Sequence, residues 1–442
     1  MTLFVYSYIL KIMLAELTNR FLLRHNVYYG WVMAVIVFII TMAASSVSSI
    51  PQIILLPMTE EFGWQISDVA NAIGLMFIVL ACFAPFSGAL MLKIGIRNVA
   101  IIAASLNIGG LLFTALAEKT WHLLFSIGVL MGSAAGIIGV GLAATVATRW
   151  FVKRRGLVVG ALTSAFAAGQ LLFVPLMAWI TTITDWRHAL LIPLSGGLIS
   201  AILFLLFSKD WPYDLKLAPF GETDLFEPPK DDGKSIVSTS FNVLINASKT
   251  PAFWLLASTF MICGLSSNGI VSQHFIPFCA DNNVGIVAAS SYLAIMGVFN
   301  FIGTIGSGWL SDRYNNYRLL MCYYGLRALS LLYLPYSGFE FYTLILWAIF
   351  FGLDFIATVP PTVRLTSKHF GTVKGPILFG WIFAAHQVGA AIAASSAGWS
   401  RDTLLSYVPS FIAAGLISAT AVLLIFVFQR IDTQSNGATA AP

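Results

Sequence analysis

Apolar runs of about 20 residues, repeated along most of the chain, constrain the fold more than any other feature of the sequence. A helix of about 20 apolar residues is long enough to cross the hydrocarbon core of a bilayer. Charged residues make up only 10% of the chain, whereas they make up about a quarter of a typical soluble domain. The sequence therefore predicts an all-α, multi-pass membrane protein with twelve transmembrane helices. The expected spans are 29–50, 68–91, 98–117, 121–147, 157–180, 187–207, 251–275, 286–310, 317–336, 341–363, 376–397 and 407–428.

The distribution of Lys and Arg predicts the orientation of these spans. With both ends of the chain on one side, 20 of the 24 Lys and Arg residues fall on that side, in the two tails and the even-numbered connections. Because cationic loops are retained in the cytoplasm, we expect both termini there. The net charge of +5 resides in these short loops and does not indicate nucleic-acid binding.

The longest connection, 209–249, separates two sets of six spans, and the two sets repeat with an offset near 220 residues. Gly88 matches Gly308 at this offset, and Gly132 matches Gly352. A parallel repeat of this kind predicts two pseudo-symmetric six-helix bundles. The expected divisions are a cytoplasmic N-terminal segment at 1–27, an N-terminal bundle at 28–208, a cytoplasmic linker at 209–249, a C-terminal bundle at 250–430 and a cytoplasmic tail at 431–442.

The first 25 residues do not have the pattern of a signal peptide. No basic region precedes their apolar stretch, and no small-residue cleavage site follows it. We expect a short interfacial segment there, or a true first residue at Met13.

Two opposite charges are expected near the middle of the membrane. Asp354 lies in span 341–363, where a carboxylate costs several kcal/mol unless it is paired, hydrated or protonated. The same span contains Pro360 and Pro361, which remove two backbone donors. Arg327 on the preceding span and Asp354 each lie roughly 14 Å from the cationic end of their helix. Equal depth on consecutive antiparallel helices predicts an ion pair between them.

The loop after the eighth span reads GWLSDR from Gly308 to Arg313. Gly308 should allow close helix approach, and Asp312 should cap a helix and meet basic groups across the bundle interface. Such contacts would latch the cytoplasmic side while the cavity opens outward; a solvated charged turn is the alternative. In the first half Leu92 occupies the acidic position, which predicts a weaker latch.

Several stretches resemble bacterial members of the major facilitator superfamily, in the monocarboxylate and oxalate/formate branch. They are RWFVKRRGL, HFIPF, GWLSDR, GLDFIATVPP and FGWIFAAHQVGAA, and the similarity covers about residues 28–430. The resemblance implies the facilitator fold, with a central site used by alternating access. Carboxylate-moving members are associated with a cation in the eighth span, whereas 286–310 has no Lys or Arg. The intramembrane arginine and the glycine-proline pattern of drug/proton members are also missing.

The remaining polar residues offer further site candidates. His386 and Gln387 lie about 18 Å into the eleventh span, where the imidazole could titrate, bond the substrate or make only an interhelical bond. His274 is placed about 37 Å along the seventh span, at the outer mouth, either as a gate residue or without a role. Asn268, Gln170 and Asn300 lie on spans that face the cavity in the facilitator fold, and are otherwise helix-helix contacts.

These features predict a secondary transporter and not an enzyme. The chain has no phosphate loop ending in Gly-Lys-Ser/Thr, and its four cysteines have no metal-binding spacing. No cofactor or metal is expected, and the protein should act as a monomer. The favoured substrate is a small organic anion moved by proton coupling or exchange, with Asp354 as first proton carrier, Arg327 controlling its protonation, and His386 second. An exporter of a drug-like compound or a secreted metabolite such as a siderophore is the alternative, and a non-transporting sensor is a third reading.

Overall fold

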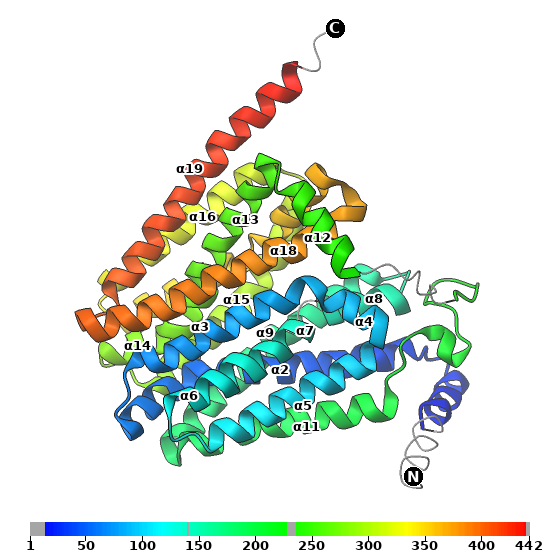
Figure 1. Cartoon of the computed structure of the whole chain (residues 1–442), viewed down its shortest axis with the longest axis horizontal. Coiled ribbons are helices and arrows are strands. Elements are labelled where there is room, and N and C mark those ends of the chain that lie inside the picture. Colours follow the sequence, from blue (N-terminus) through cyan, green and yellow to red (C-terminus); the bar gives the residue numbers. More distant parts are fainter. Residues whose placement is uncertain (1–13, 139–140, 228–235, 439–442) are drawn as a thin grey trace.

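The computed structural model describes residues 14–138, 141–227 and 236–438, which form two helical bundles (Figure 1). Residues 14–24 are helical and precede the first span. The elements of the N-terminal half are α2 (Gly30–Phe62), α3 (Ile66–Phe83), η1 (Ala84–Phe86), α4 (Ser87–Ile94), α5 (Ile96–Ala115), α6 (Thr120–Leu123), η2 (Leu124–Met131), α7 (Gly132–Ile138), α8 (Gly141–Trp150), α9 (Arg155–Ile183), α10 (Trp186–Ala189) and α11 (Leu191–Phe207).

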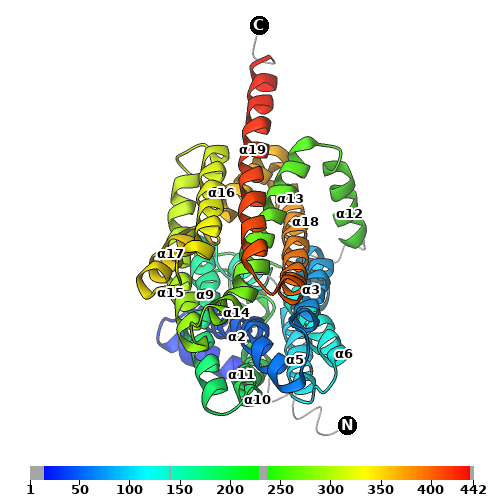
Figure 2. The same ribbon diagram turned by 90° about the vertical axis from the view of Figure 1, so that its left-hand side faces the viewer.

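The linker between the halves contains a short 3₁₀ helix, η3 (Pro212–Leu215), and one α-helix, α12 (Ile236–Ala247). The elements of the C-terminal half are α13 (Pro251–Gly264), η4 (Leu265–Val271), α14 (Ser272–Asp281), α15 (Ile286–Ser311), α16 (Asn316–Tyr333), η5 (Leu334–Tyr336), α17 (Phe341–Asp354), α18 (Val359–Leu404) and α19 (Val408–Ala438). Figure 2 shows α13 and α16–α19 in one half of the molecule and α2, α5, α6, α10 and α11 in the other.

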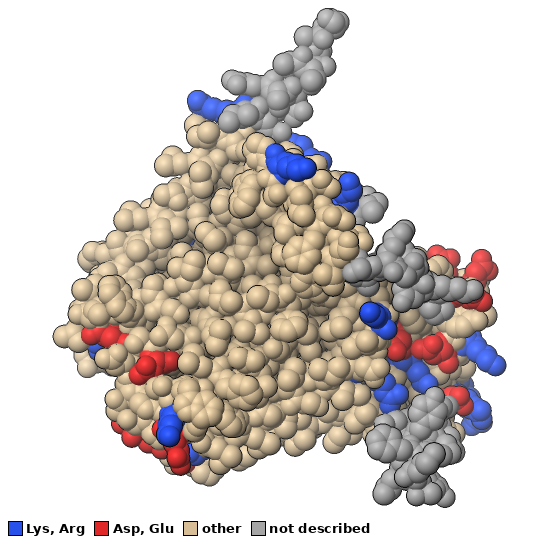
Figure 3. All heavy atoms as spheres, in the orientation of Figure 1, with Lys and Arg blue, Asp and Glu red and all other residues tan. Residues whose placement is uncertain are grey.

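Eleven helices within the described ranges are long and apolar enough to cross a membrane. The expected ninth span corresponds to α16, which is 18 residues long and carries Arg318 and Arg327, so its composition alone does not qualify it. It nevertheless packs along α19 inside the C-terminal bundle. The architecture is therefore that of twelve helices in a facilitator fold. Figure 3 agrees, since its charged side chains gather toward the ends of the molecule and leave a wide uncharged belt.

The helix boundaries differ from expectation around the tenth span. The structure divides 341–363 at Asp354, where α17 ends, and α18 begins at Val359 after a four-residue turn. The second part runs past Arg364, which was expected to mark the end of the span. Within α18, Gly371 adopts a left-handed φ of 79°, so the tenth and eleventh spans are separate helices joined at this glycine.

Equivalent glycines place equivalent helices in contact in the two halves. A Cβ atom at Gly132 would lie 2.8 Å from the carbonyl oxygen of Met76, and one at Gly352 would lie 2.5 Å from that of Met296. All four positions obey the offset of 220 residues. Only a glycine permits this approach, so the repeat seen in the sequence is also a repeat of helix packing.

The close approach expected at Gly308 is not present. A Cβ atom there would meet open space, whereas one at Gly303, on the same helix, would collide with the backbone of Leu353. The adjacent Ser307 does contact the turn after α17, since its hydroxyl donates to the carbonyl of Ala357 at 2.5 Å, so Gly308 lies on a face of α15 away from that contact.

The two bundles share a hydrophobic core at one end of the molecule. We call the end with the loops at Lys93, Arg149 and Arg313 the basic end. At the opposite end one hydrophobic cluster contains buried side chains from both bundles, including Ile54 and Phe275. Toward the basic end the core divides into one cluster per bundle, represented by Trp150 and by Phe260.

A smaller contact joins the bundles on the basic side. The ring centroid of Phe86, in η1, lies 5.7 Å from those of Phe241 on α12 and Trp381 on α18.

A direct polar contact also joins the bundles at the opposite end. The carboxylate of Asp402, near the end of α18, accepts the backbone N–H groups of Ile66 and Ser67 at 3.0 and 2.7 Å. These N–H groups begin α3 and have no partner within the helix, so Asp402 caps a helix of the other bundle. This conformation is closed at the opposite end.

Candidate functional site: a buried arginine–aspartate network

A break in the tenth span sets the geometry of the site. The N–H of Val359 bonds to the carbonyl of Ile356 at 2.9 Å, so it does not reach the carbonyl of Phe355 as it would in a continuous helix. Pro360 and Pro361 follow at once and have no N–H to offer. The backbone around Asp354 and Phe355 therefore presents acceptors that another group must satisfy.

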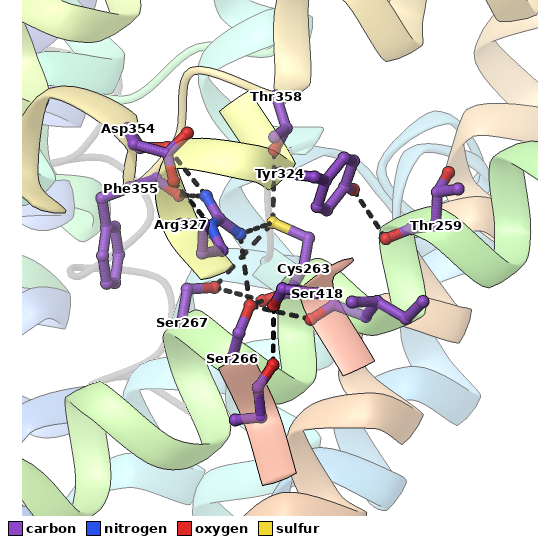
Figure 4. A network of polar contacts seen from close by, with 12 residues as sticks. Thr259, Cys263, Ser266, Ser267, Tyr324, Arg327, Asp354, Phe355, Thr358 and Ser418 are labelled. Atoms are coloured by element: carbon purple, nitrogen blue, oxygen red, sulfur yellow. Dashed lines mark hydrogen bonds and ion pairs between the residues drawn. The ribbon is translucent and has the colours of Figure 1, made fainter. Parts of the chain in front are cut away.

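Arg327 satisfies them from α16 (Figure 4). Its Nε donates to Oδ2 of Asp354 at 2.7 Å, so the predicted ion pair is present. Its Nη2 donates to the carbonyls of Asp354 and Phe355 at 2.8 and 3.1 Å. Its Nη1 donates to the Cys263 sulfur at 2.9 Å and to the Ser266 hydroxyl at 3.4 Å. A guanidinium has five N–H groups, and all five are engaged here.

The carboxylate of Asp354 is less completely satisfied than its partner. Arg327 is fully buried and Asp354 is 4% exposed. One oxygen of Asp354 accepts the hydrogen bond from Arg327 Nε, but Oδ1 is buried and has no hydrogen-bond partner among the residues that the structure describes. A buried acceptor without a donor is costly, and it is the atom at which a proton would be gained with the least rearrangement.

Further groups extend the network across four spans. The Cys263 sulfur lies 3.2 Å from the Thr358 hydroxyl. The His386 ring packs against Phe260, with ring centroids 4.8 Å apart, and its Nδ1 has no partner. Tyr324 lies beside the guanidinium, 5.7 Å from ring centroid to Arg327 Cζ.

The network lies within the C-terminal bundle. Each hydrogen-bond partner of Arg327 described above belongs to α13, η4 or α17 or to the turn after α17. The sequence predicted the pair from depth, but it did not indicate Cys263, Ser266 or Thr358. A usable signal existed, because Cys263 and Ser266 are three residues apart and so share a helix face.

The equivalent place in the N-terminal bundle is neutral. At the offset of 220 residues, Asn107 corresponds to Arg327, Ala134 to Asp354 and Ala43 to Cys263. Asn107 and Ala43 line a cavity there, together with Ser200 on α11. The two halves share a backbone design, but the charge pair belongs to one of them.

The other site candidates lie in different surroundings. Gln387 is buried beside His386, and its Oε1 has no partner. Asn300 is buried on α15 and accepts a hydrogen bond from Thr304 at 3.2 Å. Asn268 in η4 and Gln170 in α9 are half-buried. Substrate contact by these residues stays a prediction.

His274 is fully buried toward the opposite end of the C-terminal bundle. Its Nε2 lies 2.8 Å from the carbonyl oxygen of Ala394, and its ring centroid is 5.3 Å from that of Tyr407, in the connection between α18 and α19. His274 thus connects the seventh span to the eleventh, and its role as a gate residue stays a prediction.

The gate candidates at the basic end make contacts within their own bundle. Asp312 forms an ion pair with Arg364 on α18, and both side chains are about half exposed. Arg313 stacks on Trp309, with Cζ 4.1 Å from the ring centroid. The expected contact of Asp312 across the interface is not the one seen, because its carboxylate is engaged by Arg364 of the same bundle.

The N-terminal half compensates for the acid missing at Leu92. The carboxylate of Asp210, after α11, accepts the N–H groups of Ile96 and Arg97 at 2.5 and 3.3 Å and so caps α5. Arg149 donates to the carbonyl of Asp210 at 3.3 Å. Sequence comparison of the two loops could not find this residue, since it comes from a different connection.

Comparison with known proteins agrees with the fold. The Major Facilitator Superfamily profile matches residues 33–394, and the chain belongs to this superfamily. It is therefore a multi-pass membrane transporter and not an enzyme.

The similar proteins fall in the branch that the sequence motifs predicted. The chain is 23% identical to monocarboxylate transporter 12-B of Danio rerio, over 90% of this chain and 86% of that protein. It is 24% identical to the oxalate:formate antiporter of Oxalobacter formigenes, over 81% and 84%. It is also 25% identical to the uncharacterized MFS-type transporter YcxA of Bacillus subtilis, over 85% and 90%.

Proposed function

We propose that this protein moves a small organic anion of the carboxylate class across the membrane by alternating access. The observation that carries the proposal is the buried Arg327–Asp354 pair on a broken helix, with one carboxylate oxygen left unpaired. Similar proteins named for monocarboxylates and for oxalate and formate support the same substrate class. The transporter would sit in a bacterial inner membrane as a monomer, with the basic end and both termini in the cytoplasm.

Asp354 is the proposed proton carrier. While it is ionised, every N–H group of Arg327 is held by protein acceptors, and the guanidinium has no donor left for a substrate carboxylate. Protonation of Asp354 would remove the charge that holds Nε and leave a neutral acid. The arginine would then carry an uncompensated charge, which favours the arrival of an anion. Proton and anion binding would thus support each other.

The bundle arrangement supplies the second part of the cycle. The conformation described here is closed at the opposite end by the shared hydrophobic cluster and by Asp402, so it corresponds to an inward-facing state when the basic end is cytoplasmic. Rocking of the bundles would break these contacts and bring the two halves together at the basic end. Loss of the contacts of Asp402 would accompany each turnover.

The test is uptake by purified protein in sealed vesicles. Labelled oxalate, formate and lactate are supplied outside, with and without an acidic exterior, and an exchange assay uses vesicles loaded with the unlabelled acid. We expect saturable uptake of at least one acid, faster with the pH gradient. A protein that binds or moves none of them in either assay, while remaining folded and monodisperse, would refute the carboxylate proposal. Equal rates with and without the gradient would refute proton coupling alone.

A further inference from the structure

Each bundle is preceded by a short helix, and the two helices are equivalent in the repeat. The helical residues 14–24 come before α2, and α12 comes before α13. At the offset of 220 residues, Leu17 corresponds to Val237 and Phe21 corresponds to Phe241. The internal repeat therefore includes these helices as well as the spans.

Both helices expose apolar side chains at these equivalent positions. Leu17 and Phe21 are 55% and 61% exposed, and Val237 and Phe241 are 51% and 43% exposed. Ile245, one turn beyond Phe241, is 54% exposed. Residues four apart lie on one face of a helix, so each helix presents a continuous apolar stripe.

The remaining faces of the helices fix how the stripes are held. Ala15 is fully buried in the core cluster of the N-terminal bundle. On α12, the hydroxyl of Ser240 accepts a hydrogen bond from the indole of Trp381 at 3.0 Å, and Leu244 packs against the C-terminal core. The first helix is thus docked on the N-terminal bundle by one face. α12 is docked mainly on the C-terminal bundle, and the Phe241 ring also contacts Trp381 and, in the N-terminal bundle, Phe86, at centroid distances of 5.2 and 5.7 Å. The outer side of each stripe stays exposed.

The charges beside the two stripes differ. Arg20 and Arg24 are exposed next to Leu17 and Phe21, with Arg20 4.0 Å from Glu16. The polar face of α12 carries only uncharged residues, among them the exposed Asn242 and Asn246. The first helix is a basic amphipathic helix and the second is a neutral one.

The position of the helices points to the bilayer as the surface that covers the stripes. α12 ends at Ala247, and α13 enters the membrane from Pro251. The exposed indole of Trp254 donates to the carbonyl of Ser248 at 2.7 Å, and exposed tryptophans mark the membrane interface. Figure 1 shows the first helix near the N-terminus, toward the same side as α4 and α8, and Figure 2 shows α12 on the rim of the molecule, outside α18.

We propose that these two helices are a matched pair of membrane-surface anchors at the basic end. Their stripes insert at the boundary between headgroups and acyl chains of the adjacent leaflet, one stripe for each bundle. Arg20 and Arg24 give the first anchor a preference for anionic headgroups, which α12 lacks. The first anchor is packed on the N-terminal bundle and α12 mainly on the C-terminal bundle, so the two anchors hold both bundles at the same membrane surface.

The test measures the depth of single spin labels in the full-length protein, in a background with Cys82 and Cys322 replaced by serine. Cysteines replace Phe21 or Phe241, and Glu16 or Asn242 serves as the exposed polar control on the same helix. The protein is reconstituted into an equal mixture of phosphatidylcholine and phosphatidylglycerol. Collision rates with oxygen, which partitions into lipid, and with a neutral nickel chelate, which stays in water, are compared.

We expect the oxygen-to-nickel ratio to be several-fold higher at Phe21 and Phe241 than at their controls. Ratios equal to the controls would mean that the stripes face water and would overturn the proposal. Low collision rates with both reagents would mean that protein covers the stripes, which also overturns it. These measurements do not depend on transport, so their outcome tests the membrane anchors independently of the proposed substrate.

The lipid preference is tested with the same labels. Removing phosphatidylglycerol should lower the ratio at Phe21 several-fold and leave the ratio at Phe241 unchanged. In the double variant Arg20→Gln and Arg24→Gln, the ratio at Phe21 should no longer respond to phosphatidylglycerol. An undiminished response in that variant, or an equal response at Phe241, would refute the assignment of anionic-lipid binding to the first helix.

Discussion

Breaking the Arg327–Asp354 pair from either side is the most informative perturbation of this protein. The substitution Arg327→Gln removes a cation that serves five acceptors, among them a buried carboxylate and two backbone carbonyls. Leaving one charge of a buried pair uncompensated costs about 3–5 kcal/mol. We place Arg327→Gln near the upper limit, because both oxygens of Asp354 then lack a partner. Asp354→Asn belongs near the lower limit, since an amide oxygen can still accept Nε and four other bonds remain.

The double variant separates the possible roles of the pair. Removing both charges together can be almost neutral for folding, so it should recover much of the stability that either single change loses. A loss of 3–5 kcal/mol lowers the unfolding temperature by on the order of 10 °C in a bundle of this size. The measurement is thermal unfolding in detergent, followed with a thiol-reactive dye that reports exposure of the buried Cys263 and Cys279.

Transport by the double variant then decides between mechanisms. If the pair is only structural, the double variant transports as well as it folds. If Asp354 carries the proton, it folds but no longer accumulates substrate against a gradient, and only exchange or downhill flux remains. If Arg327 binds the anion, exchange fails too. Single variants that unfold and transport like the unmodified protein would refute the coupling of these two residues.

Three further predictions follow from the ends of the molecule. A cysteine at Glu222, in the described part of the linker, should resist impermeant thiol reagents in intact cells, and labelling there would reverse the proposed orientation. Asp312→Asn should leave membrane insertion unchanged and slow transport, because it weakens charge contacts that favour one conformation. Lys93→Gln should slow transport less. Unchanged transport rates for Asp312→Asn would mean that this loop is only a solvated turn. Asp402→Asn should weaken the cap on α3 by about 1–2 kcal/mol, which corresponds to roughly a 5- to 30-fold shift toward the outward-facing state. A cysteine at Ser395, at the bundle interface, should then react correspondingly faster with an external thiol reagent, and an unaltered rate would show that Asp402 does not hold this end closed.

Sequence reasoning found the charge pair because charges inside a membrane have few possible partners. The positions of Arg327 and Asp354 relative to the helix ends sufficed to place them at one depth, and the structure joins them at 2.7 Å. The neutral members of the network could not be found in this way. A cysteine or serine in a span is compatible with lipid, with helix packing and with hydrogen bonding, so Cys263 and Ser266 carried no comparable constraint.

The errors of sequence reasoning arose where it assigned contacts to particular residues of a helix. Gly308 was assigned a close helix approach that Gly303, on the same helix, makes instead. Asp312 was expected to meet the other bundle, and it pairs with Arg364 of its own bundle. Apolar composition indicates a membrane helix, but it does not show which of its residues meet a neighbouring helix. The sequence also could not predict at which end the two bundles are closed, because the repeat permits closure at either end equally.

The neutral character of the N-terminal bundle has a consequence for the charge moved in each cycle. Ala134 stands where the C-terminal bundle has Asp354, so the repeat contains the proposed proton-carrying position once and not twice. With Asp354 as the carrier, one proton accompanies each substrate. A monovalent anion would then cross without net charge, and its accumulation would be independent of the membrane potential. A divalent anion would carry one net negative charge, which is worth about 2.3 kcal/mol for each 100 mV.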